Sequence, residues 1–300
     1  MTLLSPATIK SLLAKYSAAP LKKFGQNFLL DKNVLEKIIT AAEIDRGETV
    51  IEIGPGIGAL TQALASRAKK VIAIEKDRKM VEILKETMRD CKNVEIIESD
   101  ILQLQDIPPF NSLPAALCSL PKSSEQINQR KAHCRDFKVV ANLPYNIASA
   151  VIRKFLEAKN QPKEMILMLQ KEVAQRICGE PPNMSLLSVA VQFYAKTKII
   201  SYVSKNSFWP RPKVDSAIIK ITPRSKKQTK INNASNFFRV ARAGFLSPRK
   251  QLINNLSNGL KTDRQIILTA LAKAKISPSQ RAETLTIENW LNLTAALSKK

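Results

Sequence analysis

The fold of this 300-residue chain is decided by the stretch Val50-Ile51-Glu52-Ile53-Gly54-Pro55-Gly56-Ile57-Gly58. Residues 50–53 have the pattern of a short buried strand, and the glycines after them predict a tight turn. Beyond the turn, apolar residues recur at helical spacing at Leu60, Ala63, Leu64 and Ala68. A strand, a glycine turn and a helix in this order predict an α/β fold, with a doubly wound, mostly parallel sheet.

The glycine turn also indicates what kind of ligand it accepts. Glycines allow φ > 0 and let the backbone approach a ligand closely. Their spacing is G-x-G-x-G, which differs from the G-x-G-x-x-G of dinucleotide binders, and Glu52 precedes them. A carboxylate at this point suits a cationic or amine-bearing ligand better than a pyrophosphate, which prefers bare N–H groups. The spacing therefore disfavours a dehydrogenase.

Two further acids follow predicted strands. Residues 71–74 end in Glu75, and residues 94–97 end close to Asp100. Ligands of an open parallel sheet lie outside the carboxyl ends of its strands, so Glu52, Glu75 and Asp100 are expected in one pocket. An acid after the second strand commonly holds ribose hydroxyls, and one after the third can accept a hydrogen bond from an adenine amine. The competing interpretation is that each is a solvated loop acid.

The turn Asn142-Leu143-Pro144-Tyr145 is suited to holding an amino group. It follows the apolar residues 139–141 and leads into an amphipathic stretch at 147–156. The exocyclic amine of adenine is a poor nucleophile, so an enzyme that alkylates it must orient the nitrogen. The Asn142 amide oxygen and the Leu143 carbonyl can accept its two N–H bonds, while Pro144 stiffens the turn and Tyr145 offers a stacking ring. The alternative is that these residues form an ordinary turn with no role in binding.

These motifs together resemble the small-subunit (16S) ribosomal RNA adenine N6,N6-dimethyltransferases, which use S-adenosylmethionine. The resemblance spans nearly the whole chain. Its motifs are Phe24-Gly25-Gln26-Asn27-Phe28-Leu29, residues 52–58, Glu75, Asp100, residues 142–147, 169–176, 208–216 and 237–240, and Arg249-Lys250. It implies a Rossmann-like S-adenosylmethionine-dependent methyltransferase fold with a small all-helical C-terminal domain.

The resemblance also implies roles for single residues. The residues expected to bind the cofactor are Gln26, Asn27, Leu29, Glu52, Gly54, Glu75, Asp100, Ile101 and Asn142. Within this set, Glu75 is expected at the ribose, and Asp100 with Ile101 at the adenine. The residues expected at the transferred methyl group and the target base are Asn142, Leu143, Pro144, Tyr145 and Phe208. Of these, Phe208 is expected to stack on the flipped base opposite Tyr145.

The implied activity is dimethylation of the N6 atoms of two adjacent adenosines in the 3′-terminal hairpin loop of small-subunit rRNA, during small-subunit biogenesis. The implied partner is an immature small ribosomal subunit, and we expect a monomer. Because the sulfonium is already an activated methyl group, in-line positioning and charge stabilisation carry most of the acceleration. No histidine base is needed, which fits a chain whose one histidine, His133, is remote from the motifs.

Two alternatives stay open. A large-subunit adenine N6-methyltransferase of the macrolide-resistance type shares the motifs, although the turn at 142–145 and the long helical tail favour the small-subunit class. A non-catalytic RNA-binding assembly factor is the second. The intact set of Gln26, Asn27, Glu75, Asp100 and Asn142 argues against lost cofactor binding.

Charge supports a nucleic-acid partner. The chain has 48 Lys plus Arg against 25 Asp plus Glu, a formal net charge of +23. Residues 224–300 hold 15 basic and 3 acidic side chains, so about half of the excess lies there. Such a distribution favours a polyanion. The chain contains no apolar run of about 18 residues, so no membrane span is predicted.

The predicted domains are residues 1–223, the methyltransferase domain, and residues 224–300, a basic helical RNA-binding domain. Further strands are predicted at 165–169, 198–203 and 216–221, and a surface insertion at about 105–137. The four cysteines are widely spaced without a C-x-x-C pair, which predicts a reducing compartment, the cytoplasm. Cys118, His133 and Cys134 match no common zinc spacing, so no metal site is predicted.

Overall fold

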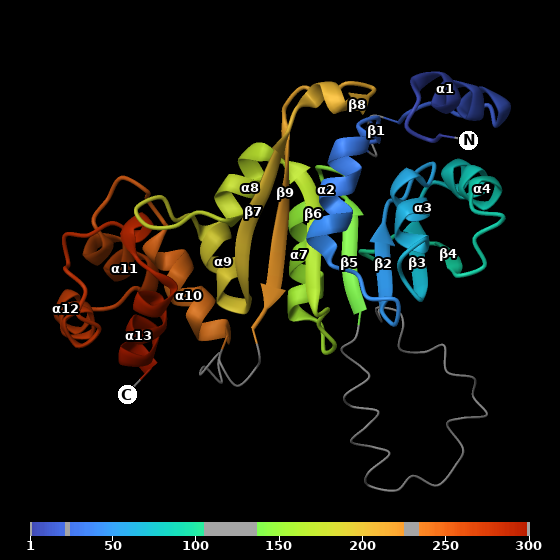
Figure 1. Ribbon diagram of the computed structural model, residues 1–300. Helices are drawn as coiled ribbons and strands as arrows, with labels where there is room; N and C mark the ends of the chain where they lie inside the picture. The colour runs from blue at the N-terminus through green and yellow to red at the C-terminus, as the bar shows by residue number, and fades with distance from the viewer. Residues whose placement is uncertain (1, 22–24, 105–136, 225–233, 299–300) are drawn as a thin grey trace, which may run out of the picture. The chain divides into compact units, whose positions relative to one another are not determined.

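The computed structural model describes residues 2–21, 25–104, 137–224 and 234–298 (Figure 1). The predicted insertion at about 105–137 lies outside the described residues except for Phe137. That residue begins strand β5 (Phe137–Asn142) and is not part of the insertion. Cys118, His133 and Cys134 also lie outside the described ranges.

The chain divides into two compact units. Unit 1 comprises Met1–Ala174 and Lys198–Pro223, and unit 2 comprises Gln175–Thr197 and Arg224–Lys300. The predicted boundary at residue 223 differs from this division, because Gln175–Thr197 groups with the C-terminal helices. The reason is a set of aromatic contacts: the Phe193 ring of helix α9 (Leu186–Tyr194) lies 4.2 Å from Phe237 and 5.2 Å from Phe238, centroid to centroid.

Seven strands in the described residues form the main sheet, in the order β4-β3-β2-β5-β6-β9-β7. Their bounds are β2 Thr49–Ile53, β3 Lys70–Glu75, β4 Val94–Glu98, β5 Phe137–Asn142, β6 Glu164–Gln170, β7 Ala195–Val203 and β9 Ser216–Pro223. The pairs among β2 to β6 are parallel, and β9 runs antiparallel to β6. All three later strands were predicted, although β7 begins three residues earlier than the predicted 198. The sheet therefore has the doubly wound arrangement that the glycine turn predicted.

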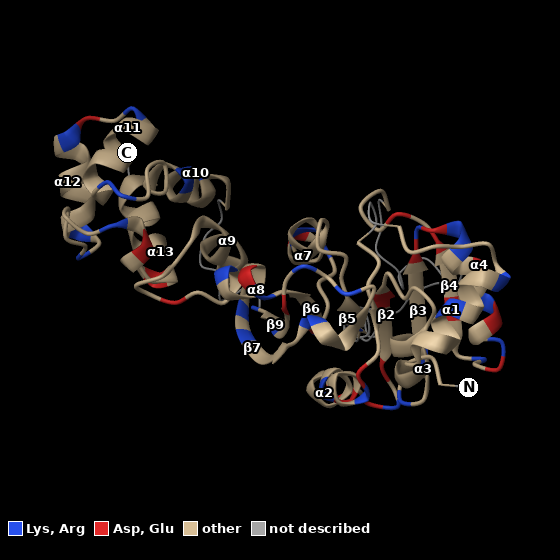
Figure 2. Ribbon diagram, turned by 90° about the horizontal axis from the view of Figure 1, so that it is seen from above, with Lys and Arg blue, Asp and Glu red and all other residues tan. Residues whose placement is uncertain are grey.

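Helices cover both faces of this sheet (Figure 2). Their bounds are α2 Lys32–Ala42, α3 Ala59–Ala65, α4 Arg78–Thr87, α7 Ala148–Glu157 and α8 Lys171–Ile177. Central strands buried on both faces are mostly apolar, as at Val50, Ile51 and Ile53 of β2, where Glu52 is the exception. Two helix starts have acidic caps: Asp31 accepts from Asn33 N and Val34 N, and Asp77 accepts from Lys79 N. Helix α1 (Pro6–Lys15) and the short pair β1 (Phe28–Leu29) with β8 (Phe208–Trp209) complete unit 1.

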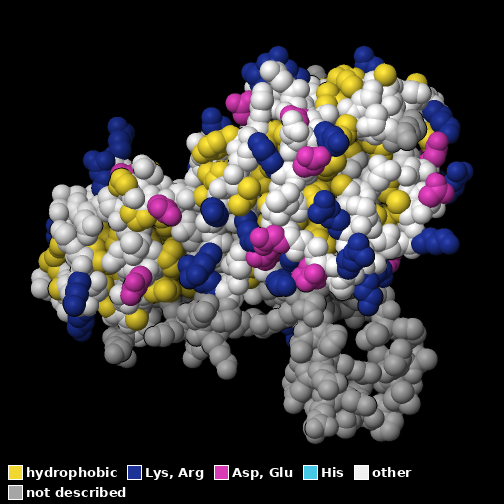
Figure 3. All heavy atoms as spheres, viewed as in Figure 1, with side chains coloured by type: hydrophobic (Ala, Val, Ile, Leu, Met, Phe, Trp, Pro, Cys, Tyr) yellow, Lys and Arg dark blue, Asp and Glu magenta, His cyan; other side chains and the backbone are white. Residues whose placement is uncertain are grey.

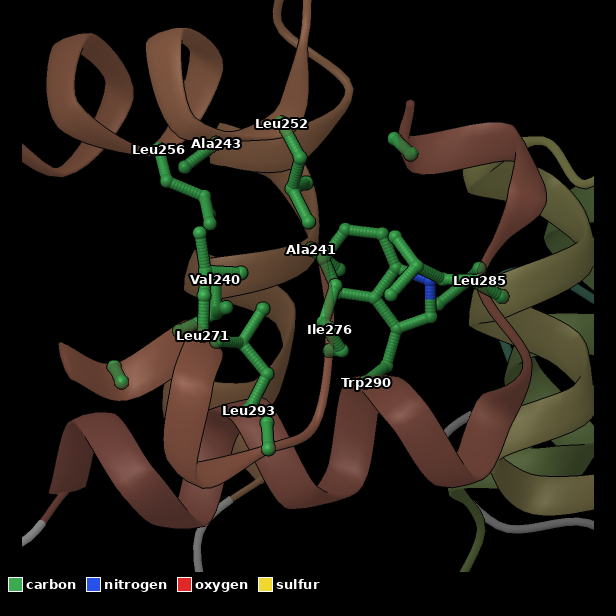
Figure 4. Close-up of a cluster of buried hydrophobic side chains, with 14 of the residues drawn as sticks. Val240, Ala241, Ala243, Leu252, Leu256, Leu271, Ile276, Leu285, Trp290 and Leu293 are labelled. Carbon is green, nitrogen blue, oxygen red and sulfur yellow. The ribbon is translucent and has the colours of Figure 1, made fainter. Parts of the chain in front are cut away.

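Unit 2 is helical apart from the start of β7. Beside α9 it contains α10 Ala234–Gly244, α11 Leu252–Leu260, α12 Arg264–Lys273 and α13 Ile287–Ser298. Figure 4 shows the Trp290 indole of α13 among Ala241, Leu252, Ile276 and Leu285. A Cβ on Gly244 would lie 2.3 Å from this ring, so only glycine allows α10 to approach it so closely. The indole is thus the centre of the core of unit 2.

Replacing Trp290 with alanine is expected to lower the free energy of unfolding of unit 2 by about 3–5 kcal/mol, the usual cost of truncating a fully buried large aromatic side chain. The measurement is urea unfolding followed by circular dichroism. Ile266→Ala, at an exposed position of α12, is the control and is expected to stay within about 0.5 kcal/mol of the unsubstituted protein. Equal unfolding curves for the two variants would contradict the role given to the indole.

Candidate functional site

A cavity of about 220 Å³ lies at the carboxyl ends of the parallel strands of unit 1. All predicted site residues except Tyr145 and Phe208 line it. Those that line it are Gln26, Asn27, Leu29, Glu52, Gly54, Glu75, Asp100, Ile101, Asn142, Leu143 and Pro144. Figure 1 shows β1 and β8 beside the same edge of the sheet. The convergence of acids predicted from the strand ends is therefore observed.

The glycine turn forms the floor of the cavity because its backbone can come close to other segments. Gly54, Gly56 and Gly58 have φ values of 66°, 59° and 93°, which side-chain-bearing residues rarely adopt. A Cβ on Gly54 would meet the ring of Pro144 at 3.5 Å, so the turn at 142–145 lies directly against the glycine turn. Gly54 N donates to Ile74 O at 2.9 Å, which ties the turn to β3.

Glu75 binds the backbone of two segments through both carboxylate oxygens. Oε2 accepts from Gly56 N at 3.1 Å, and Oε1 accepts from Lys76 N at 2.8 Å and Asp77 N at 2.9 Å. Burial raises the pKa of the Glu75 carboxyl, while these three amides oppose the rise. The side chain is thus oriented before any ligand arrives.

The N-terminal segment is attached to Asp77, the cap of helix α4, and to β5. Gln26 Nε2 donates to Asp77 Oδ2 at 2.8 Å, and the Gln26 side-chain oxygen accepts from Leu21 N at 2.8 Å. Asn142 Nδ2 donates to Asn27 O at 3.2 Å, which joins this segment to β5. These contacts bring residues 26–29 to the cavity, although more than a hundred residues separate Asn27 from Asn142.

Glu52 is the most deeply buried acid of the site. It is 1 % exposed, and its Oε2 atom has no hydrogen-bond partner among the described residues. Burial raises the pKa of its carboxyl to about 8. The group is therefore mostly protonated at neutral pH until a cation or hydrogen-bond donor enters the cavity.

This raised pKa predicts a pH-dependent stability. An unfolded glutamate releases its proton near its ordinary pKa of 4.5, but Glu52 in the fold holds it until about pH 8. Between these values the native state binds more protons, so stability falls as the pH rises. Relative to Glu52→Gln, the unsubstituted protein is expected to lose roughly 3–5 kcal/mol between pH 5 and pH 8.

The measurement is urea unfolding of both proteins at half-unit pH intervals. Below about pH 4.5 the contribution of Glu52 is constant, because both states hold the proton. Parallel stability curves across the whole interval would show that Glu52 is ionised in the fold.

Asp100 is an ionised acid with both oxygens engaged. Lys76 Nζ lies 2.7 Å from its Oδ2 atom, and Oδ1 accepts from Leu102 N at 2.9 Å. The hydrogen bond from Lys76 lowers the pKa of the Asp100 carboxyl. Lys76 also lines the cavity and was not predicted from the sequence. Its position after Glu75 was visible, but its pairing with an acid on the next strand end was not.

The turn at 142–145 is hydrogen-bonded to β6 and to β9. Leu143 N donates to Met168 O at 3.0 Å, and the Tyr145 hydroxyl lies 2.9 Å from Ser216 Oγ. Burial raises the pKa of the Tyr145 phenol. Because Asn142 uses its amide nitrogen for Asn27, its side-chain oxygen is the atom that remains for a ligand.

Phe208 does not lie where the resemblance placed it. It pairs with Leu29 in the β1–β8 ladder, is 3 % exposed, and packs in a cluster with Val34, Ile38 and Val203. It does not line the cavity in this structure. The neighbouring Phe28 was also missed as a lining residue; its ring lies 3.2 Å from a Cβ placed on Gly56. Both rings are positioned by the pairing of β1 with β8, and these two strands are far apart in the sequence.

Comparisons with known proteins agree with this geometry. The family model for ribosomal RNA adenine dimethylase matches residues 20–299. The chain belongs to this family. It is 41 % identical over 288 residues to the ribosomal RNA small subunit methyltransferase A of Dehalococcoides mccartyi, strain CBDB1, covering 96 % of this chain and 91 % of that protein. The corresponding protein of Bacillus pumilus is 41 % identical over 300 residues, covering 98 % and 97 %.

Two solved structures share the fold. The dimethyladenosine transferase from Plasmodium falciparum has a TM-score of 0.71 at 27 % identity, covering 89 % of this chain and 95 % of that one. The 23S rRNA methyltransferase ErmE has a TM-score of 0.70 at 25 % identity, covering 91 % and 100 %. One of these two structures is named for 23S rRNA, so the fold alone does not decide the RNA substrate, whereas both relatives reported above are named for the small subunit. The chain is a methyltransferase of the α/β class.

Proposed function

We propose that this protein transfers methyl groups from S-adenosylmethionine to the N6 atoms of two adjacent adenosines in the 3′-terminal hairpin loop of small-subunit rRNA. The observation that carries the proposal is the approach of the turn at 142–145 to the glycine turn. It brings an amide oxygen suited to an adenine amine next to a cavity suited to the methyl donor.

In this proposal each cavity residue binds a different part of the cofactor. Glu75 accepts hydrogen bonds from the ribose hydroxyls, and Asp100 with Ile101 addresses the adenine. Glu52 faces the cationic part of the cofactor and loses its proton when that charge arrives, since an adjacent cation favours the carboxylate. Gly54 gives the backbone room for the amino-acid part. Gln26, Asn27 and Leu29 close the cavity from the N-terminal segment.

The target base is held by the turn. The Asn142 side-chain oxygen and the Leu143 carbonyl accept the two N–H bonds of the amine, which directs the nitrogen lone pair at the methyl carbon. Tyr145 stacks on the flipped base, with Pro144 keeping the turn rigid. Phe208 is proposed as the second stacking ring, which requires β1–β8 to open when the base enters, because the ring is buried in this structure.

Two methyl transfers to one nitrogen require a tolerant site. After the first transfer the amine keeps a single N–H, so one of the two acceptors releases its contact while the other retains it. Loops of RNA supply unstacked adenines at low cost, which suits a cavity that accepts an extruded base.

The proposed partner is an immature small ribosomal subunit, and the proposed state is a cytoplasmic monomer. On the face shown in Figure 3, Lys and Arg side chains lie scattered among fewer acids. Lysine and arginine contacts to phosphates make RNA binding strongly salt-dependent. None of the helices in the described ranges has the length and apolar character that crossing a bilayer demands.

The test incubates the protein with S-adenosylmethionine labelled in the methyl group, at low salt, with free small-subunit rRNA, immature small subunits or large-subunit rRNA. The expected product is N6,N6-dimethyladenosine at two neighbouring positions of the small-subunit RNA. Labelling of large-subunit RNA alone would favour the macrolide-resistance class. Absence of label from every small-subunit substrate would overturn the proposal and favour a non-catalytic assembly factor.

A further inference from the structure

An exposed tyrosine with a cation over its ring lies in unit 1, outside the cavity. Tyr202, near the end of the edge strand β7, is 52 % exposed, and Lys171 Nζ lies 5.2 Å from its ring centroid. Figure 2 shows α8, which begins at Lys171, beside β7. A single exposed aromatic side chain is common on protein surfaces, so its surroundings decide whether it forms a site. Lys171 covers part of the Tyr202 ring, and the rest of the ring is exposed, so another molecule can contact it.

The tyrosine is connected to the turn that holds the target base. Tyr145 bonds to Ser216 through their hydroxyls at 2.9 Å. The residue before Ser216 is Asp215, whose carbonyl accepts from Lys171 N at 3.0 Å. Lys171 then reaches the Tyr202 ring. A short series of contacts within unit 1 therefore links the Tyr202 ring to Tyr145.

The surroundings of the ring are basic and apolar. Along β7, exposed positions alternate, so Lys198, Ile200 and Tyr202 share one face. Lys213 and Val214 are exposed in the segment that leads into β9. None of Lys171, Lys198 and Lys213 forms an ion pair with a described residue.

Two acids, Asp215 and Glu172, lie near the three lysines, so the net charge of this surface is positive. Asp215 Oδ1 accepts from Lys205 N at 3.0 Å, so that carboxylate is engaged with the backbone. Glu172 follows Lys171 on α8 and is exposed. A ring flanked by lysines matches a nucleotide, which offers a π face to stack and a phosphate to pair. It matches an acidic protein surface less well, because such a surface has nothing to stack on the ring.

We propose that Tyr202 and Lys171 form a stacking subsite for a single-stranded RNA nucleotide that flanks the target adenosine. The base stacks on the Tyr202 ring, and Lys171 with Lys198 pairs with the adjoining phosphates. The subsite rests on the proposed function, since it assumes that RNA enters at this edge of the sheet. It adds affinity for RNA without touching the cofactor cavity.

The first test measures binding of a single-stranded, adenine-containing oligoribonucleotide by the full chain. Tyr202→Ala is expected to weaken binding by about tenfold, in the range found when a stacking aromatic is removed. Tyr202→Phe keeps the ring and is expected to bind like the unsubstituted protein. Lys171→Ala is expected to reduce the slope of log affinity against log salt by about one.

The second test separates this subsite from the cofactor site. In methyl transfer, Tyr202→Ala should raise KM for RNA by the same factor as it weakens binding, with KM for S-adenosylmethionine unchanged. A photoreactive aromatic residue at position 202 should crosslink to RNA when immature small subunits are added, which also tests the site if Tyr202→Ala fails to fold.

Equal RNA binding by Tyr202→Ala and the unsubstituted protein would overturn the subsite, as would a crosslink to a protein of the subunit in place of RNA. The binding and crosslinking measurements need no methyl transfer. A protein that binds through Tyr202 but transfers no methyl group would contradict the proposed function alone.

Discussion

Asn142→Ala is expected to lower kcat for methyl transfer by about 10²–10³-fold, the range seen when one positioned polar group or its alignment is lost at a reacting centre. The Asn142 amide nitrogen donates to Asn27 O at 3.2 Å, which leaves its side-chain oxygen as the acceptor for the ligand. Alanine removes both the acceptor for the adenine amine and the contact that holds the N-terminal segment.

The measurement is single-turnover methyl transfer at saturating cofactor and RNA. Asn33→Ala, an exposed asparagine in α2, is the matched control and should keep full activity. Affinity for S-adenosylhomocysteine should change less than tenfold, because Glu75 and the glycine turn remain. Full turnover by a folded Asn142→Ala protein would falsify the proposal that this amide orients the nucleophile.

Glu75→Ala is expected to weaken cofactor binding by about 100-fold or more, because hydrogen bonds to a charged group contribute about 1.5–3 kcal/mol each and a ribose offers two hydroxyls. The substitution also leaves the amides of Gly56, Lys76 and Asp77 without their acceptor. The glycine turn then loses its link to β3 through this side chain, and the cavity loses part of its preformed shape.

Isothermal titration with S-adenosylhomocysteine measures this effect. The control is Glu98→Gln, since Glu98 is the register partner of Glu75 on β4 but is exposed. Its substitution should leave the dissociation constant within about twofold, as expected for a surface position away from the cavity. A folded Glu75→Ala protein that binds S-adenosylhomocysteine as tightly as Glu98→Gln does would remove Glu75 from the proposed site.

Much of the site could be predicted because its residues follow a repeated local rule. Glu52, Glu75 and Asp100 each stand at or just after the end of a short apolar strand, and parallel strands bring such ends to one edge. The glycine turn could also be predicted, because the positive φ values that it adopts favour glycine. Neither inference needed to know which distant residues meet.

Other features depended on contacts that no local pattern encodes. The resemblance implied that Phe208 stacks on the flipped base, yet the pairing of β8 with β1 buries its ring in this structure. No local pattern shows which unit helix α9 joins, and the contacts of Phe193 with Phe237 and Phe238 assign it to unit 2. The pairing of Lys76 with Asp100 likewise joins the ends of two strands.

The amino-acid order by itself determined the α/β class, the cavity at the carboxyl ends of the strands, and its acids, glycine turn and turn at 142–145. Strand and turn patterns are short-range properties, so a single sequence carries them. The tertiary structure alone decided the protonation of Glu52, the burial of Phe208 and the contacts that link Tyr202 to Tyr145. Each of these depends on how far water is excluded and which distant segments touch, and both follow only once the whole chain has packed.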